Sequence, residues 1–307
     1  MGEGLSSLRP KLRIVDPHVH FWDLSRARYA WLQDDPLPNN PAGDMSPIAH
    51  RDYLPPDYRR DAQGWRVDKV IHVECGLPRQ GQLAETAWLD GLADAEGLPT
   101  ALVAGVDLLD PRLDARLEAQ AACGRVRGVR QIVCWHQDPL KTYTPRDLLL
   151  DPAWWAGFAR LSAHGLSFDL QLYPGQMAEA GRQLARFPET PVIVNHAGLP
   201  TDPGEAARAL WLDGLRRLAA LPQVSLKISG LGITHPRLNL DAAWPTITQC
   251  LEAFGVDRCM FASDFPVDSV HAGFDAIFDL FDVATTRFSA AEREGLFAAN
   301  AEAIYRI

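Results

Sequence analysis

The feature that most constrains the fold is a regular alternation of short apolar runs with longer helical patterns. The runs are rich in β-branched residues and mostly apolar rather than alternating, as expected for strands that are covered on both faces. Eight of them occur, at residues 12–15, 70–73, 102–106, 126–133, 166–172, 192–195, 224–228 and 259–262. The segments between them predict helices at residues 82–96, 112–123, 153–164, 176–187, 204–220, 241–254 and 289–305.

Helix boundaries are marked at several of these segments. Asp110-Pro111 and Asp151-Pro152 each place an N-cap residue before a proline suited to the first helical turn. Gly165 suits the position after a helix C-terminus. These signals support the division of the chain into β–α units.

Eight β–α units predict a single (β/α)₈ TIM barrel, an α/β fold, over residues 1–307 with its core at 12–305. A doubly wound sheet is the alternative. That fold usually has a glycine-rich turn after its first strand, whereas the first run here leads into Asp16-Pro17-His18-Val19-His20. The barrel is therefore favoured.

One connection, over residues 21–66, is unusually long and rich in proline and aromatic residues. Disordered segments typically lack aromatic residues, and long ordered loops are usually functional. We expect this segment to be an ordered excursion over the barrel mouth. A packing arm or an oligomer contact is the alternative.

Charge and cysteine usage exclude several classes of partner. The net charge is −9, from 30 basic and 39 acidic residues, so we expect neither nucleic acid nor anionic membranes as partners. The five cysteines form no CxxC pair, which favours reduced thiols and a cytoplasmic location. Residues 1–11 lack the apolar region of a signal peptide, and no apolar run is long enough to span a bilayer.

The residues that could carry chemistry follow the predicted strands. His18 and His20 are two residues apart, so both imidazoles face one side of a strand. His196 and Asp264 follow the sixth and eighth strands. Because active sites of TIM barrels lie at the C-terminal ends of the strands, and strands one and eight become neighbours on closure, we expect the four residues to cluster. Such a set suits a metal ion or the polarisation of an oxygen atom.

Five segments, in order, resemble one known family. They are Asp16-Pro17-His18-Val19-His20-Phe21-Trp22, Gly128-Val129-Arg130-Gln131, Asn195-His196-Ala197-Gly198, Lys227-Ile228-Ser229-Gly230-Leu231 and Ala262-Ser263-Asp264-Phe265-Pro266-Val267. Together they resemble the amidohydrolase superfamily, in its amidohydrolase-2 group of sugar lactonases and pyrone-dicarboxylate lactonases. The resemblance implies that His18, His20, His196 and Asp264 form the site, that Asp264 is the general base, and that Arg130 binds the substrate or its carboxylate.

The chain departs from metal-rich members of this superfamily. These members carry a carboxylated lysine on strand four and a histidine on strand five. Here strand four reads Arg127-Gly128-Val129-Arg130-Gln131-Ile132 and contains no lysine. Strand five reads Phe168-Asp169-Leu170-Gln171-Leu172-Tyr173 and contains no histidine. We therefore expect at most one divalent ion, Zn²⁺ or Mn²⁺, held by His18, His20, His196 and Asp264. A metal-free site is the alternative, and no organic cofactor is expected.

Further candidates for substrate contacts lie at other strand ends. Glu74 shares a face with His72, and the two could form a structural pair or contact the substrate. His136 could reach the mouth from the fourth unit, Lys227 faces inward in register with Ser229, and Trp22 follows the two histidines. A salt bridge to a neighbouring carboxylate is the alternative role for Lys227, and an ion pair within the barrel is the alternative for Arg130.

These observations predict hydrolysis of a carboxylated or polyhydroxylated lactone by water that Asp264 activates. A mononuclear-metal decarboxylase or hydratase of the same superfamily is one rival, and an inactive partner subunit is another. The state of assembly is open between a monomer and a homo-oligomer.

Overall fold

The computed structural model of the chain describes residues 12–235 and 238–307. The prediction that no signal peptide occupies residues 1–11 concerns a segment outside this part. Among the described helices, none has the length and apolarity needed to cross a membrane.

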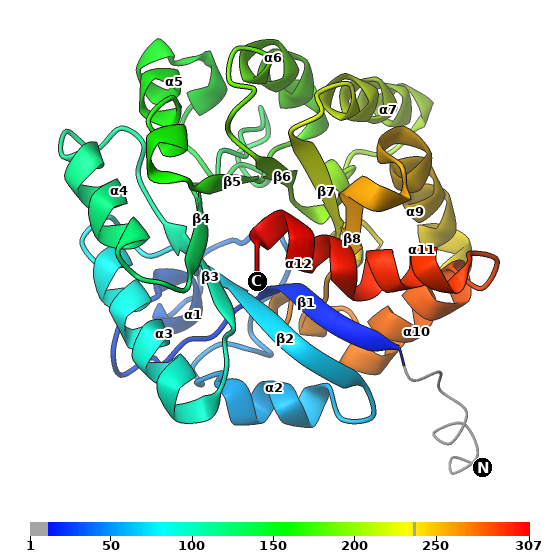
Figure 1. Cartoon of the computed structure of the whole chain (residues 1–307), viewed down its shortest axis with the longest axis horizontal. Coiled ribbons are helices and arrows are strands. Elements are labelled where there is room, and N and C mark those ends of the chain that lie inside the picture. The colour runs from blue at the N-terminus through cyan, green and yellow to red at the C-terminus, as the bar shows by residue number, and fades with distance from the viewer. Residues whose placement is uncertain (1–11, 236–237) are drawn as a thin grey trace.

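Eight parallel strands form one sheet in the order of the sequence, from β1 to β8. The sheet closes through a parallel bridge between Val19 and Phe265, where the amide of His20 donates to the carbonyl of Phe265 over 2.8 Å. Figure 1 shows the strands as a ring with the helices outside it. The predicted TIM barrel is confirmed. The strands are β1 (Arg13–Val19), β2 (Arg66–Val73), β3 (Ala101–Gly105), β4 (Val126–Arg130), β5 (Ser167–Leu170), β6 (Val192–Val194), β7 (Val224–Ile228) and β8 (Cys259–Phe261).

The helices cover the outside of the ring and bury its apolar strands. The boundary signals act as expected at α5, where Pro152 is the first helical residue. There the Asp151 carboxylate accepts from the amide of Ala153 over 2.8 Å, as an N-cap side chain does. The longer helices are α3 (Gln82–Glu96), α4 (Leu113–Ala121), α6 (Pro174–Leu184), α7 (Glu205–Ala219), α9 (Leu240–Phe254) and α10 (Phe274–Ala284). The shorter ones are α1 (Ala30–Gln33), α2 (Pro55–Asp61), α5 (Pro152–Phe158), α8 (Leu231–Thr234), α11 (Ala290–Glu294) and α12 (Asn300–Tyr305).

The C-terminal segment and α10 differ from the sequence-based expectation. The helix predicted at 289–305 is interrupted by a π-helical stretch, Gly295–Ala299, which separates α11 from α12. Helix α10 has no counterpart among the predicted helices, although Phe274, Ile277, Phe278 and Phe281 have helical spacing and are all buried.

The interior of the barrel contains an ionic cluster as well as apolar side chains. Asp169 of β5 accepts hydrogen bonds from Lys227 of β7 over 2.6 Å and from the hydroxyl of Tyr305 over 2.8 Å. Tyr305 belongs to α12, which lies across the ring in Figure 1. All three side chains are fully buried. The cluster therefore ties the C-terminal helix to the barrel interior.

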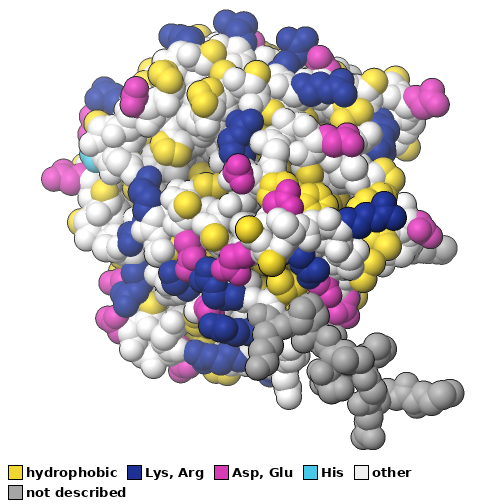
Figure 2. Space-filling model, turned by 45° about the vertical axis from the view of Figure 1, so that its right-hand side comes forward, with side chains coloured by type: hydrophobic (Ala, Val, Ile, Leu, Met, Phe, Trp, Pro, Cys, Tyr) yellow, Lys and Arg dark blue, Asp and Glu magenta, His cyan; other side chains and the backbone are white. Residues whose placement is uncertain are grey.

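Acidic and basic side chains are intermixed on the face of the molecule that Figure 2 shows. Many are paired, as in the bond between Arg13 and Glu302 over 2.8 Å and the bond between Lys69 and the same carboxylate over 2.7 Å. This distribution accords with the acidic net charge of −9.

Candidate active site

The strand ends place the predicted site residues in one group at the C-terminal mouth of the barrel. His18 belongs to β1, and His20 follows that strand directly. The amide of Asp264, just beyond β8, donates to the carbonyl of His18 over 2.9 Å. His196 follows β6, and its ring centroid lies 4.5 Å from that of His18. The topology of the barrel therefore brings together residues that lie far apart in the sequence.

The backbone is strained at two of these residues. His196 has a φ of 54° and Asp264 has a φ of 58°. Both values lie in the left-handed region, which non-glycine residues rarely adopt. Such strain costs about 1–3 kcal/mol per residue and concentrates at functional sites. Both side chains line a cavity at the mouth of the barrel.

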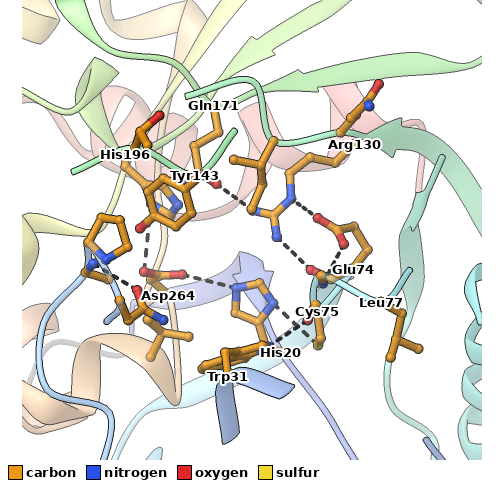
Figure 3. A pocket seen from close by; sticks show the side chains of 18 of the residues that line it. His20, Trp31, Glu74, Cys75, Leu77, Arg130, Tyr143, Gln171, His196 and Asp264 are labelled. Carbon is orange, nitrogen blue, oxygen red and sulfur yellow. Dashed lines mark hydrogen bonds and ion pairs between the residues drawn. The ribbon is translucent and has the colours of Figure 1, made fainter. Parts of the chain in front are cut away.

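Asp264 lies among three imidazoles. Its Oδ1 is 3.3 Å from Nε2 of His20 and 3.5 Å from Nε2 of His18, and its Oδ2 is 3.9 Å from Nδ1 of His196. Figure 3 shows the carboxylate of Asp264 directed toward the ring of His20. The arrangement joins one potential base with three groups that can donate hydrogen bonds or bind a cation.

Burial sets the protonation states of this group. It raises the pKa of Asp264 to about 7, lowers the pKa of His20 to about 3, and lowers the pKa of His18 and His196 well below the usual range of imidazole. The imidazoles are therefore neutral near pH 7. Asp264 titrates in the same range, which suits a general base.

Arg130 enters the mouth from the end of β4 and is held on several sides. Its Nε donates to Glu74 Oε1 over 2.7 Å, one terminal nitrogen donates to the carbonyl of Glu74 over 2.6 Å, and the other donates to Gln171 over 3.0 Å. The side chains of Arg130 and Glu74 are 4% and 5% exposed. The guanidinium charge is thus compensated within the protein, as Figure 3 shows.

A cavity of about 510 Å³ opens over this group, within the usual size of small-molecule sites. The predicted excursion at 21–66 lines it with Trp31 and Asn39. The connection after β4 contributes Tyr143, whose hydroxyl points toward Asp264 in Figure 3. The side-chain amide of Asn39 donates to the backbone carbonyl of Leu140 over 2.8 Å, so the two connections meet over the mouth.

Three predicted substrate-binding residues lie elsewhere. Trp22 is fully buried, and its indole donates to the carbonyl of Arg51 over 2.9 Å. Lys227 is fully buried against Asp169. His136 lines a separate cavity of about 290 Å³ and lies 3.3 Å from Asp202. Trp22 and Lys227 are therefore buried side chains that do not line the cavity over Asp264. His136 lies in the neighbouring loops and lines the second cavity.

Some cavity residues carry no signal in the sequence. Tyr143 and Asn39 lie in irregular connections, where no periodic pattern fixes the direction of a side chain. Trp31 lies in the short helix α1 within the long connection after β1. The aromatic content of residues 21–66 is the available clue for Trp31. Cys75, which follows β2, lines the cavity with its Sγ 3.8 Å from Nδ1 of His20.

The mouth contains a set of donors that fits one divalent cation. One ligand atom each from His18, His20 and Asp264 lies within 4.8 Å of the others. Nδ1 of His20 bonds the carbonyl of Val73 over 2.7 Å. This bond orients the ring and leaves the lone pair of Nε2 free for a metal. Two imidazoles and a carboxylate suit zinc and manganese. His196, the fourth predicted ligand, is not a member of this set.

A second group of potential ligands, formed by His72, Cys75 and Glu85, lies beside the cavity, which Cys75 also lines. Nδ1 of His72 accepts the amide of Phe21 over 3.0 Å. Since the neutral ring then carries its proton on Nε2, that nitrogen has no lone pair to offer a metal. This group is therefore a polar cluster of the protein interior.

The chain belongs to the amidohydrolase family, whose sequence profile matches residues 15–307. The order of motifs and the barrel agree with this membership, and the predicted resemblance to the amidohydrolase-2 group is confirmed. The chain is accordingly an enzyme of this family.

Similar proteins come from several bacteria. The chain is 37% identical to the uncharacterized protein y4mH of Sinorhizobium fredii, over 96% of this chain and 99% of that protein. It is 33% identical to the L-fucono-1,5-lactonase of Burkholderia multivorans, over 95% and 96% of the two chains. The crystal structure of an amidohydrolase from Burkholderia multivorans with bound zinc superimposes with a TM-score of 0.79 at 30% identity, over 96% and 99% of the two chains.

Proposed function

We propose that this enzyme opens a lactone ring by hydrolysis and that Asp264 activates the water. The observation that carries the proposal is the position of Asp264 beside three neutral imidazoles at the wall of a cavity, with its pKa raised to about 7 by burial. The relative named L-fucono-1,5-lactonase, which is similar over nearly the whole chain, supports the same class of reaction.

The proposed reaction has two steps. In the first, water attacks the lactone carbonyl carbon while Asp264 accepts a proton from it, and the carbonyl oxygen becomes an oxyanion. In the second, the bond to the ring oxygen breaks and Asp264 returns the proton to that oxygen, which leaves a hydroxy acid. Positioned proton transfer of this kind typically contributes about 10²–10⁴-fold to the rate.

The imidazoles would stabilise the oxyanion. His18 and His196 are neutral and buried, so each can donate one hydrogen bond without solvent competition. The proton of His20 is used by the carbonyl of Val73, so Nε2 of His20 offers a lone pair to a cation and not a hydrogen bond to the oxyanion. A divalent ion bound by His18, His20 and Asp264 would supply Lewis-acid polarisation of the same oxygen. We propose Zn²⁺ or Mn²⁺ for this position, at one ion per chain.

The pairing of Arg130 bears on the substrate. A free guanidinium would favour a carboxylate. This one already donates to the carboxylate and the backbone carbonyl of Glu74 and to Gln171, and one of its terminal nitrogens also lies 3.4 Å from Nε2 of His18. Arg130 can still contact a hydroxyl or carbonyl oxygen, since a guanidinium carries five N–H donors. We therefore propose an uncharged, polyhydroxylated sugar lactone as substrate, in preference to a dicarboxylated one.

A substrate panel tests the proposal. Purified enzyme is mixed with sugar 1,5-lactones, pyrone dicarboxylate and hydroxylated benzoates while proton release and carbon dioxide release are recorded. Proton release with a sugar lactone is expected. Carbon dioxide release from an aromatic acid would replace the proposal with decarboxylation, and no turnover across the panel would favour an inactive partner subunit.

A further inference from the structure

The residue that faces His196 from the neighbouring strand is Ser229. Its Oγ lies 3.1 Å from Nδ1 of His196, and the two side chains come from the connections after β7 and β6. Ser229 is 1% exposed and His196 is 3% exposed. This hydrogen bond is therefore buried within the protein.

The backbone beside Ser229 is shaped to let the imidazole approach. Gly230 has a φ of +59°, and a Cβ atom at this position would lie 2.7 Å from Nδ1 of His196. That is closer than side-chain carbons come to other heavy atoms, so glycine is required here by contact as well as by conformation. His196 itself has a left-handed φ of 54°.

The direction of the hydrogen bond follows from the hydroxyl of Ser229. Within the described part of the chain this hydroxyl has no hydrogen-bond partner besides Nδ1 of His196. If Nδ1 carried the proton, the hydroxyl hydrogen would be buried without an acceptor, and unmet donors of this kind are costly. If the hydroxyl donates to Nδ1, the hydrogen is satisfied and the proton of the neutral imidazole resides on Nε2.

Asp264 does not reverse this assignment. Its Oδ2 is 3.9 Å from Nδ1 of His196, which is beyond hydrogen-bonding distance. His20 shows the opposite arrangement, because its Nδ1 faces a carbonyl oxygen that can only accept. The neighbours of the two rings thus assign opposite tautomers, with a free lone pair on Nε2 of His20 and a proton on Nε2 of His196.

We propose that Ser229 is a positioning residue that holds His196 with its proton on Nε2, so that His196 donates a hydrogen bond into the cavity and does not bind a metal. In lactone hydrolysis the acceptor is the oxyanion that forms on the carbonyl oxygen. This last statement rests on the proposed function, whereas the tautomer itself does not.

Nuclear magnetic resonance tests the tautomer without any substrate. In protein labelled with ¹⁵N-histidine, long-range ¹H–¹⁵N spectra separate protonated from unprotonated ring nitrogens, and the His196→Gln variant identifies the signals of His196. A proton on Nε2 is expected in the wild type, with a loss of this preference in Ser229→Ala. A wild-type proton on Nδ1, or an unchanged tautomer in Ser229→Ala, would overturn the proposal.

The kinetics of Ser229 variants provide a second test. Ser229→Ala should lower kcat by up to about tenfold and change KM by less than about twofold, because the affected hydrogen bond matters most in the transition state. Ser229→Thr retains the hydroxyl and should restore most of the rate. Ser225→Ala, the same change elsewhere on β7, is the control and should behave like the wild type.

The outcomes separate this proposal from the proposed function. Zinc bound by Ser229→Ala and by His196→Gln should equal zinc bound by the wild type. A loss of zinc in His196→Gln would make His196 a ligand and overturn the assignment. If the wild type hydrolyses no lactone, the proposed function fails, while the tautomer and the zinc content still decide the role of Ser229.

Discussion

Two buried ionic groups lie in the same barrel and are built differently. In the interior, Asp169 accepts hydrogen bonds from Lys227 over 2.6 Å, from Tyr305 over 2.8 Å and from Asn195 over 2.9 Å. At the mouth, the nearest side-chain nitrogen to the carboxylate of Asp264 is 3.3 Å away. The interior carboxylate thus accepts three short hydrogen bonds, whereas the mouth carboxylate is 3.3 Å or more from every side-chain nitrogen of the described residues that faces it.

The backbone and the neighbouring rings add to this contrast. Asp264 and His196 have left-handed φ values, and Nδ1 of His18 is buried without a hydrogen-bond partner among the described residues. Asp169 belongs to a regular strand. The interior group therefore stabilises the fold, while the mouth group keeps its capacity to interact with a reacting molecule.

The largest expected effect concerns the interior pair. Lys227→Met leaves Asp169 buried with its charge uncompensated, which should cost about 3–5 kcal/mol of unfolding free energy. Urea unfolding followed by circular dichroism measures it. The double variant Lys227→Met/Asp169→Leu removes both charges and should recover much of the loss. Wild-type stability in the single variant would show that this pair does not support the barrel.

The next effect concerns the metal. His20→Ala removes one of three grouped donors. It should lower zinc affinity by more than about 100-fold, because even a group that only supports a ligand is worth about 10–100-fold. Titration with a chelating dye measures the affinity. His72→Ala is the matched control, because Nε2 of His72 carries a proton, and it should retain zinc. Loss of zinc in the control alone would move the ion to the cluster of His72, Cys75 and Glu85.

Arg130 combines features of the two groups, because it is paired with Glu74 and also lines the cavity. Arg130→Met should raise KM by about tenfold with a smaller change in kcat, since it removes charged hydrogen-bond donors from the binding space. It also leaves Glu74 unpaired, so stability should fall. Arg130→Met/Glu74→Gln should recover stability while KM stays high. A double variant with wild-type KM would mean that Arg130 is a structural residue.

The smallest expected effect is a dependence of kcat/KM on pH. Because burial raises the pKa of Asp264 to about 7, the ionised base is present above that pH and is lost below it. The value of kcat/KM should therefore fall about tenfold per pH unit on the acid side of this pKa, as initial rates across a pH series will show. An acid limb that begins near the usual pKa of an aspartate would contradict the role of burial.

The sequence predicted the barrel and the grouping of His18, His20, His196 and Asp264 because both follow from topology. Parallel strands of a closed barrel end at one mouth, so residues at strand ends must meet there.

The depth of an inward-facing residue within the barrel is harder to predict. Lys227 is the last residue but one of β7 and precedes Ser229 by two positions. Two positions along a strand place it a layer deeper than the mouth.

The walls of the cavity could not be predicted, because they depend on contacts between distant connections. Asn39 and Leu140 are 101 residues apart and meet through one hydrogen bond. Arg130 was predicted to bind substrate, with an ion pair within the barrel as the alternative, and the identity of its partner, Glu74, follows only from the three-dimensional structure. Loop conformations follow from such tertiary contacts rather than from local periodicity.

Replacement of Asp264 by asparagine tests the central claim most directly. The amide keeps the shape of the side chain but cannot accept the proton of water. On any lactone that the wild type hydrolyses, Asp264→Asn should lower kcat by at least about 100-fold, while its unfolding midpoint stays close to that of the wild type. Activity within about threefold of the wild type, from a protein shown to be folded, would contradict the account and direct the search for the base to Glu74.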